Sequence, residues 1–200
     1  MSPNKIVITG TIASGKSTLS EILRKKGFLV IDSDKVNKDL LKKGEKNYLA
    51  IKNEKNFDKA FCDDKLDKKK LAEIIFASKE KRELLNKLTH KNIIDKINQI
   101  VENSEKKYVF IEIPLYFSMK EKFPNQAVRL VMANEEIQVE RLMKRDKIDR
   151  KYALKKIESQ KNKEEMKKNS SYIFDNSKDY EYLEGQVNLA LNELEKKWKF

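Results

Sequence analysis

The stretch Gly10-Thr11-Ile12-Ala13-Ser14-Gly15-Lys16-Ser17 decides the fold of this chain, because it fits the pattern G-x-x-x-x-G-K-[ST] in full. The apolar run Ile6-Val7-Ile8 directly before it predicts a buried strand, and the apolar residues after it, Leu19, Ile22 and Leu23, have helical spacing. A strand, a glycine loop and a helix therefore follow one another in the order that a phosphate-binding loop requires.

In such a loop, main-chain N–H groups and the positive end of the following helix bind an anion. We expect Lys16 to reach the terminal phosphates of the bound ligand and Ser17 to place its hydroxyl on Mg²⁺. The other expected nucleotide-binding positions are Gly10, Thr11, Ala13, Ser14, Gly15 and Thr18. A chance glycine- and serine-rich turn is the alternative, and the flanking strand and helix argue against it.

The composition excludes several classes of protein. A single cysteine, Cys62, rules out an intrachain disulfide. With a single histidine, His90, the chain also has too few ligands for a Cys/His zinc site. No charged leader and no apolar run long enough to span a bilayer is visible in the sequence. These features predict a cytoplasmic protein with no membrane partner, and 200 residues suit one domain with a smaller insertion.

The formal net charge of +12 could indicate a nucleic-acid partner. However, the lysines are interleaved with acidic residues, as in residues 63–70, and clustered arginines with interleaved aromatics are missing. This pattern favours a solvated surface, so we expect no nucleic-acid partner. A basic nucleic-acid-binding or nucleotide-sensing module is the alternative hypothesis, and it predicts strongly salt-sensitive binding to DNA or RNA.

Short apolar runs that alternate with helical segments predict an α/β fold, a three-layer sandwich around a five-stranded parallel sheet. The five expected strands are residues 6–8, 28–31, 108–113, 127–132 and 172–174. The charged, helical stretch between the second and third strands is too long for a simple crossover. We therefore expect a nucleotide-binding core of residues 1–34 and 106–200 with a helical insertion of residues 35–105.

Two carboxylates, Asp32 and Asp34, directly follow the second expected strand. Because parallel strands end at one edge of a sheet, this pair is expected near the loop, where a carboxylate could accept the proton of an attacking hydroxyl. The alternative is that Ser33 or Asp34 only caps a helix beginning at Lys35. Glu112, near the end of the third expected strand, is left open between support of a metal ion and a structural role.

Two arginines stand four apart on the helix expected after the fourth strand, for which Asn134 is a plausible N-cap. Arg141 and Arg145 therefore share one face. The next stretch, residues 146–168, is mostly charged and polar and predicts a mobile lid that would exclude water from phosphoryl transfer. The alternative for the arginines is an exposed helix face.

Together these segments resemble the dephospho-coenzyme A kinase family over almost the whole chain. Residues 10–18 resemble its G-G-I-x-S-G-K-S/T-T loop, and residues 26–34 resemble its x-G-x-x-V-I-D-A-D segment. Residues 141–146 resemble its R-x-x-x-R-D entry to the lid, and Gln160 resembles its lid glutamine. Further matches are residues 75–77 and 85–90 to its I-F and L-x-x-x-x-H-P stretches, residues 113–117 to P-L-L-F and residues 173–176 to V-I-x-N.

The resemblance implies a phosphate-loop kinase that uses ATP and Mg²⁺ to phosphorylate the 3′-hydroxyl of dephospho-coenzyme A. It implies that Lys16 neutralises ATP phosphates, that Ser17 meets Mg²⁺, that Asp34 is the base and that Arg145 closes over the phosphates. Asp32 and Arg141 are second choices for these catalytic roles.

The resemblance also makes the insertion the coenzyme-binding part. Residues expected to contact the acceptor are Asp34, His90, Phe76, Tyr116 and Phe117. The implied partners are small molecules only, and the chain is expected to be a monomer or a weak homo-oligomer.

Four positions depart from the family pattern. Thr11 replaces the second loop glycine, Lys38 an arginine, Lys91 a proline and Ser118 an acidic residue. None of them removes an expected catalytic group. Lysine cannot reproduce the two-pronged hydrogen bonding of arginine, so Lys38 weakens the expected substrate contact at that position.

Overall fold

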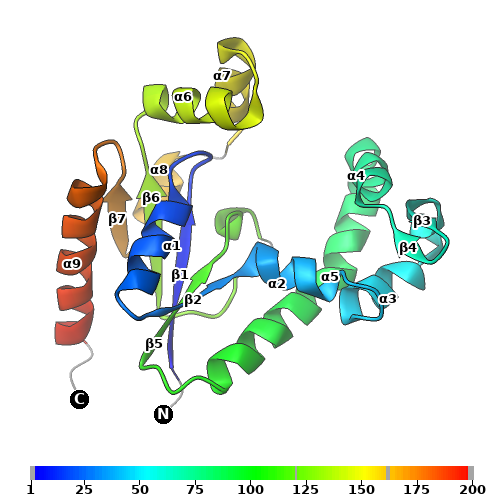
Figure 1. Ribbon diagram of the computed structural model, residues 1–200, viewed down its shortest axis with the longest axis horizontal. Helices are drawn as coiled ribbons and strands as arrows, with labels where there is room; N and C mark the ends of the chain where they lie inside the picture. The colour runs from blue at the N-terminus through cyan, green and yellow to red at the C-terminus, as the bar shows by residue number, and fades with distance from the viewer. Residues whose placement is uncertain (1–2, 120, 161–162, 198–200) are drawn as a thin grey trace. The chain divides into compact units, whose positions relative to one another are not determined.

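A computed structural model describes residues 3–119, 121–160 and 163–197 of the chain. Its contacts divide the chain into two compact units (Figure 1). The first unit is Met1–Ile31 together with Glu105–Phe200, and the second is Asp32–Ser104.

The first unit is built on a five-stranded sheet with the strand order β2-β5-β1-β6-β7 (Figure 1). The strands are β1 (Asn4–Gly10), β2 (Leu29–Asp32), β5 (Tyr108–Glu112), β6 (Ala127–Met132) and β7 (Tyr172–Asp175). β1 pairs in parallel with both β5 and β6, and β6 pairs in parallel with β7. The prediction of an α/β fold with a five-stranded parallel sheet is confirmed.

β1 is the central strand of the sheet and is covered on both faces. All residues from Ile6 to Gly10 are buried, and a strand that is apolar on both faces needs protein on both faces. Ile6 and Ile8 pack in one cluster with apolar residues of α1 (Lys16–Lys25) and α9 (Tyr180–Lys197). The α9 residues in it are Leu183, Val187, Ala190, Leu191 and Leu194, which form one apolar face of that helix.

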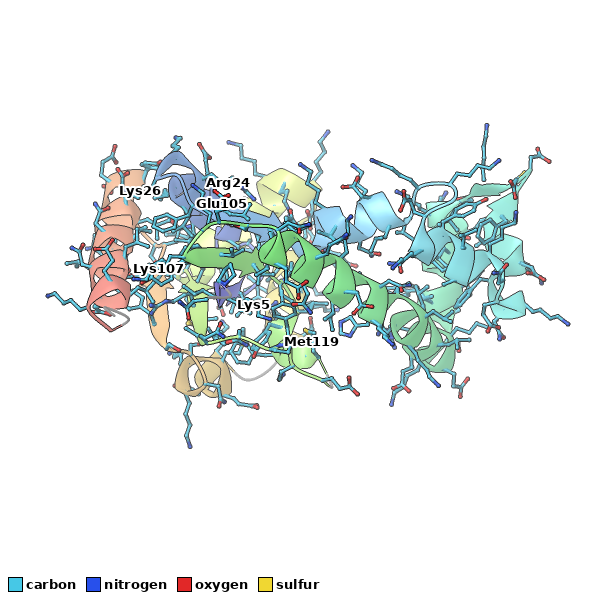
Figure 2. All side chains as sticks on the ribbon, turned by 90° about the horizontal axis from the view of Figure 1, so that it is seen from below. Lys5, Arg24, Lys26, Glu105, Lys107 and Met119 are labelled. Carbon is cyan, nitrogen blue, oxygen red and sulfur yellow. The ribbon has the colours of Figure 1, made fainter. Side chains whose placement is uncertain are left out.

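The strands of the first unit begin at an edge rich in charged side chains. Figure 2 shows Lys5 and Lys107 there, near the starts of β1 and β5, and the main chain of Asn4 donates to the Lys107 carbonyl at 2.9 Å. The Lys5 N–H donates to the side-chain oxygen of Gln126 at 2.5 Å. Because the strands are parallel, their carboxyl ends and the phosphate loop lie at the opposite edge.

Two helices, α6 (Glu135–Asp146) and α7 (Arg150–Glu158), pack on each other through Val139, Leu142, Ala153 and Ile157. α8 (Lys163–Lys168) follows and buries Met166. Residues 150–158 of the expected lid are thus anchored by two fully buried side chains, Ala153 and Ile157. Motion of this segment stays a prediction. Asn134 is the N-cap residue of α6 as expected, but its side chain makes no capping hydrogen bond.

The second unit is mostly helical. Its elements are α2 (Ser33–Leu40), α3 (Lys46–Lys52), η1 (Lys55–Ala60), β3 (Phe61–Cys62), β4 (Lys65–Leu66), α4 (Lys68–Ala77) and α5 (Lys79–Glu102). A small core of Ile51, Phe57, Ala60 and Leu71 holds them together. The β3–β4 hairpin was not expected from the sequence. Asp63 and Asp64 form its turn with positive φ angles of 45° and 65°, a conformation that aspartate tolerates better than most residues.

The part of the chain that the structure describes contains no helix with the length and apolar character needed to cross a lipid bilayer.

Candidate active site

The loop between β1 and α1 requires glycine at two positions. A side chain at Gly10 would collide with the Val131 carbonyl of the neighbouring strand. Gly15 has a φ of 89°, in the left-handed region, and a side chain there would collide with the amide of Asn176. Gly10 is therefore needed because the loop passes close to the main chain of β6. Gly15 is needed because the main chain turns there in a left-handed conformation.

Lys16 is the first residue of α1, and its ammonium group lies against the loop. Its Nζ donates to the carbonyls of Gly10 at 3.2 Å and Thr11 at 3.1 Å. The N-terminus of α1 has no side-chain cap and no acidic residue in its first turn, so its positive end suits an anion. Ser17, in the same turn, is exposed, so its hydroxyl is accessible to a ligand or a metal ion.

Side chains from distant elements hold the loop. Arg141 of α6 donates to the Ala13 carbonyl at 3.4 Å and to the Asn176 carbonyl at 3.1 Å. Asn176, directly after β7, donates from its side chain to the Ser14 carbonyl at 2.8 Å. Arg141 therefore binds the loop. The alternative interpretation, an arginine on an exposed helix face without such a contact, does not describe Arg141.

Gln138 of α6 binds Thr11, one of the positions that depart from the family pattern. Its Nε2 donates to the Thr11 hydroxyl at 2.5 Å, and both residues are fully buried. Within the described part of the chain, the Gln138 Oε1 and the Ser14 hydroxyl are buried and have no hydrogen-bond partner. Sequence reasoning missed Gln138, although it stands three residues before Arg141 and thus shares its helix face.

The lid segment contributes a further contact. The N–H of Ile12 donates to the Oε1 of Gln160 at 2.7 Å. Ile12 and Ala13 also pack against the cluster of α6 and α7 residues. The loop is thus in contact with the segment that the sequence predicts to be a lid.

Arg145 does not accompany Arg141 to the loop, although both lie on α6. Its guanidinium binds Asp146 through two hydrogen bonds, of 2.7 and 3.3 Å, and Lys156 of α7 binds the same carboxylate at 2.9 Å. The pKa of the Asp146 carboxyl lies well below its ordinary value, first because of the hydrogen bond from Arg145 and then because of that from Lys156. Asp146 therefore remains ionised at neutral pH and joins α6 to α7.

Glu112 ends β5, directly beside Ile8 of β1 in the register of the sheet. One of its carboxylate oxygens accepts a hydrogen bond from Ser20 of α1 at 2.7 Å. Ser20 stands three residues after Ser17 and so shares a helix face with it. Among the described residues, no group of three or more His, Cys, Asp and Glu side chains could hold a metal ion. A metal ion here would need ligands from a nucleotide as well.

Asp32 and Asp34 belong to the second unit. The carboxylate of Asp32 accepts the N–H groups of Asp34 at 2.9 Å and Lys35 at 3.1 Å, so Asp32 is the N-cap of α2. The alternative of a cap at Ser33 or Asp34 before a helix beginning at Lys35 is wrong, because the helix begins at Ser33 and Asp32 has the extended backbone of an N-cap. The role of Asp34 as the base stays a prediction.

Four candidate contacts to the acceptor lie in different environments. Phe76 of α4 is 90% exposed, and His90 lies within α5 in the second unit. In the first unit, Tyr116 is buried, its hydroxyl accepts a hydrogen bond from Asn125, and its ring packs edge-on against Phe117. All four contacts to a substrate stay predictions.

A family model described as dephospho-CoA kinase matches residues 5–181. The chain belongs to the dephospho-CoA kinase family. A dephospho-CoA kinase of Fusobacterium nucleatum is 38% identical over 181 residues, which cover 89% of this chain and 92% of that protein. A dephospho-CoA kinase of Enterococcus faecalis is 35% identical over 188 residues, which cover 93% and 94%.

Solved structures agree with this family assignment. A protein from Thermus thermophilus superposes with a TM-score of 0.84 at 29% identity, covering 97% of this chain and 99% of that one. The dephospho-CoA kinase of Campylobacter jejuni superposes with a TM-score of 0.62 at 30% identity, covering 96% and 97%. The dephospho-CoA kinase family consists of kinases that transfer phosphate from ATP to an alcohol group.

Proposed function

We propose that this protein transfers the γ-phosphoryl group of ATP to the 3′-hydroxyl of dephospho-coenzyme A, giving coenzyme A and ADP. The observation that carries this proposal is the loop at the end of β1, where the Lys16 ammonium lies against two loop carbonyls and the N-terminus of α1 has no side-chain cap. The family assignment supplies the acceptor. The proposal also includes a cytoplasmic location, small-molecule partners only and a monomer or a weak homo-oligomer.

Lys16 and the start of α1 would hold the phosphates of ATP. The ammonium of Lys16 would exchange the two loop carbonyls for phosphate oxygens and neutralise the charge that spreads over the γ-phosphoryl group during transfer. Arg145 would add a second positive charge if α6 and α7 bring it over the nucleotide. Arg141, by contrast, would act by holding the loop.

A magnesium ion fits the chemistry of this site. The exposed Ser17 hydroxyl and the Glu112 carboxylate are oxygen groups, the kind of ligand that Mg²⁺ prefers, and a few protein ligands suffice because phosphates and water complete its shell. When bound, the ion would neutralise charge on the β- and γ-phosphates. We propose that Ser17 contacts it directly and that Glu112 holds one of its waters.

Asp34 would accept the proton of the attacking hydroxyl. The hydroxyl oxygen forms a bond to the γ-phosphorus, the bond from phosphorus to the β–γ bridging oxygen breaks, and ADP leaves. The proton passes to the Asp34 carboxylate. Asp32 is the weaker choice for this base because its carboxylate already caps α2. The exposed ring of Phe76, together with His90, Tyr116 and Phe117, is proposed to contact the acceptor.

A direct assay tests the assignment. Purified protein with ATP and Mg²⁺ should release ADP when dephospho-coenzyme A is added, and mass spectrometry should find one added phosphate on its ribose. Adenosine monophosphate and shikimate serve as alternative acceptors. Release of ADP with either of these, but not with dephospho-coenzyme A, would overturn the assignment of the acceptor.

A further inference from the structure

One main-chain donor of the phosphate loop is already bound to a side chain. The N–H of Ile12 donates to Gln160 Oε1 at 2.7 Å, across 148 residues of sequence. In a phosphate loop the main-chain N–H groups are the groups that bind the anion. At Ile12 this group is instead engaged by the lid segment.

The main chain of Gln160 is held in place by the end of α7. The Gln160 N–H donates to the Ile157 carbonyl at 3.2 Å, which continues the last turn of the helix. Ile157 is 1% exposed and belongs to the apolar cluster against which Ile12 and Ala13 pack. The hydrogen bond to Ile12 and the apolar contacts therefore join the same two segments, α7 and the loop.

Other side chains hold the loop in a different way. Gln138, Arg141 and Asn176 donate to oxygen atoms of the loop from α6 or from the end of β7. Gln160 accepts an N–H group, and it does so from the segment between α7 and α8. A movement of α7 would therefore change the environment of a loop N–H, while the contacts from α6 and β7 could persist.

We propose that Gln160 is a positioning residue that couples α7 to the phosphate loop. It holds the Ile12 amide, so this amide does not bind phosphate, and it maintains the shape of the loop around the remaining donors. Since coupling between two sites is reciprocal, nucleotide binding to the loop must in turn change the stability of the contact with α7. This inference rests on the proposed function only in taking the ligand of the loop to be ATP.

The matched pair of variants is Gln160→Ala and Gln126→Ala. Gln126 makes the same kind of bond, from Lys5 N–H to Oε1, at the opposite end of β1. Amide hydrogen exchange of Ile12, followed by NMR without nucleotide, should become about tenfold faster or more in Q160A and should not change in Q126A. The KM for ATP should rise about three- to tenfold in Q160A, as expected for a lost hydrogen bond that organises binding, with little change in kcat.

Two further variants keep the test decisive. Gln160→Glu retains an acceptor and should restore slow exchange at Ile12, while its negative charge near the phosphates keeps the KM for ATP high. Gln160→Asn, one methylene shorter, should resemble Q160A and serves if Q160A does not fold. Exchange at Ile12 that is as slow in Q160A and Q160N as in the wild type, or an equal rise in KM for ATP in Q126A, would overturn the proposal.

Failure of the proposed function would look different. If the wild type makes no ADP with dephospho-coenzyme A, the acceptor is wrong, but exchange at Ile12 still reports on Gln160. Binding of a fluorescent ATP analogue to the wild type, Q160A and Q126A then replaces the KM comparison, with a weaker affinity expected in Q160A alone.

Discussion

Asp146 binds Arg145 through both carboxylate oxygens, at 2.7 and 3.3 Å, and shares one of them with Lys156 at 2.9 Å. Arg145, the cation expected over the phosphates, is therefore oriented by Asp146 and linked through that carboxylate to Lys156 of α7. A displacement of α7 would move the shared carboxylate and with it the guanidinium of Arg145. The orientation of Arg145 thus depends on packing between two helices.

Asp146→Asn should lower kcat about tenfold or more, because a misplaced Arg145 stabilises the transferring phosphoryl group less well. Glu136→Gln is the matched control, since Glu136 and Arg150 also join α6 to α7, at 2.7 Å, but with more than half of each side chain exposed. An exposed pair contributes little, so E136Q should change kcat less than about twofold. Steady-state kinetics of both variants decide the point, and equal effects would argue against a role of Asp146 in orienting Arg145.

Lys16→Ala should reduce turnover at least about 100-fold, because it removes a positive group from the developing charge on the phosphates. Lys25→Ala, at the other end of α1, removes an exposed lysine paired with Glu21 and should leave turnover unchanged. The measurement is ADP release under saturating ATP. Turnover by K16A within a few-fold of the wild type would exclude the loop as the phosphate site.

The variants Asp34→Asn and Asp32→Ala should distinguish the proposed role of Asp34 in proton transfer from the role of Asp32 in capping α2. D34N should lower kcat about 10²- to 10⁴-fold with nearly unchanged nucleotide affinity, because only proton transfer is lost. D32A should instead reduce the free energy of unfolding by about 1 kcal/mol through loss of the α2 cap. Kinetics and urea unfolding of both variants test this, and near-normal turnover of D34N would end its assignment as the base.

Thr11→Ala should destabilise the protein by about 1–3 kcal/mol, because it leaves the buried amide of Gln138 without its partner. Thr11→Ser keeps the hydroxyl and should lose much less. Thermal unfolding of the two variants provides the comparison. Equal losses would mean that the methyl group of Thr11, and not its hydroxyl, matters.

The ion pairs of Asp64, in the turn of the β3–β4 hairpin, should contribute less to the stability of the protein at low pH. Hydrogen bonds from Lys43 and Lys52 lower the pKa of Asp64 to about 2, below its ordinary 3.8. A carboxyl with a lowered folded-state pKa stabilises the protein above its unfolded-state pKa, and this contribution is lost as the pH falls from about 4 to 2. Asp64→Asn should therefore be less stable than the wild type at pH 6, with the difference shrinking toward pH 2. A constant difference across this range in urea unfolding would contradict the pairing.

The sequence by itself determined the phosphate loop, the five strands and the family, because each depends on a local pattern. In G-x-x-x-x-G-K-S, the two glycines stand where a side chain would collide with neighbouring atoms, and the lysine directly follows the second glycine. Buried strands are visible in the sequence as short apolar runs. The start of helix α6 was likewise expected, from the N-cap position of Asn134.

Only the tertiary structure decided which side chains hold the loop. Gln138, Gln160 and Asn176 reach it from 127, 148 and 162 residues away, and no spacing within the chain specifies such a contact. The tertiary structure also decided that Arg141 binds the loop and that Arg145 binds Asp146. Their shared helix face, which the sequence predicts, leaves these partners open. Local periodicity specifies secondary structure, but hydrogen-bond partners are selected by the packing of elements that are distant in the sequence.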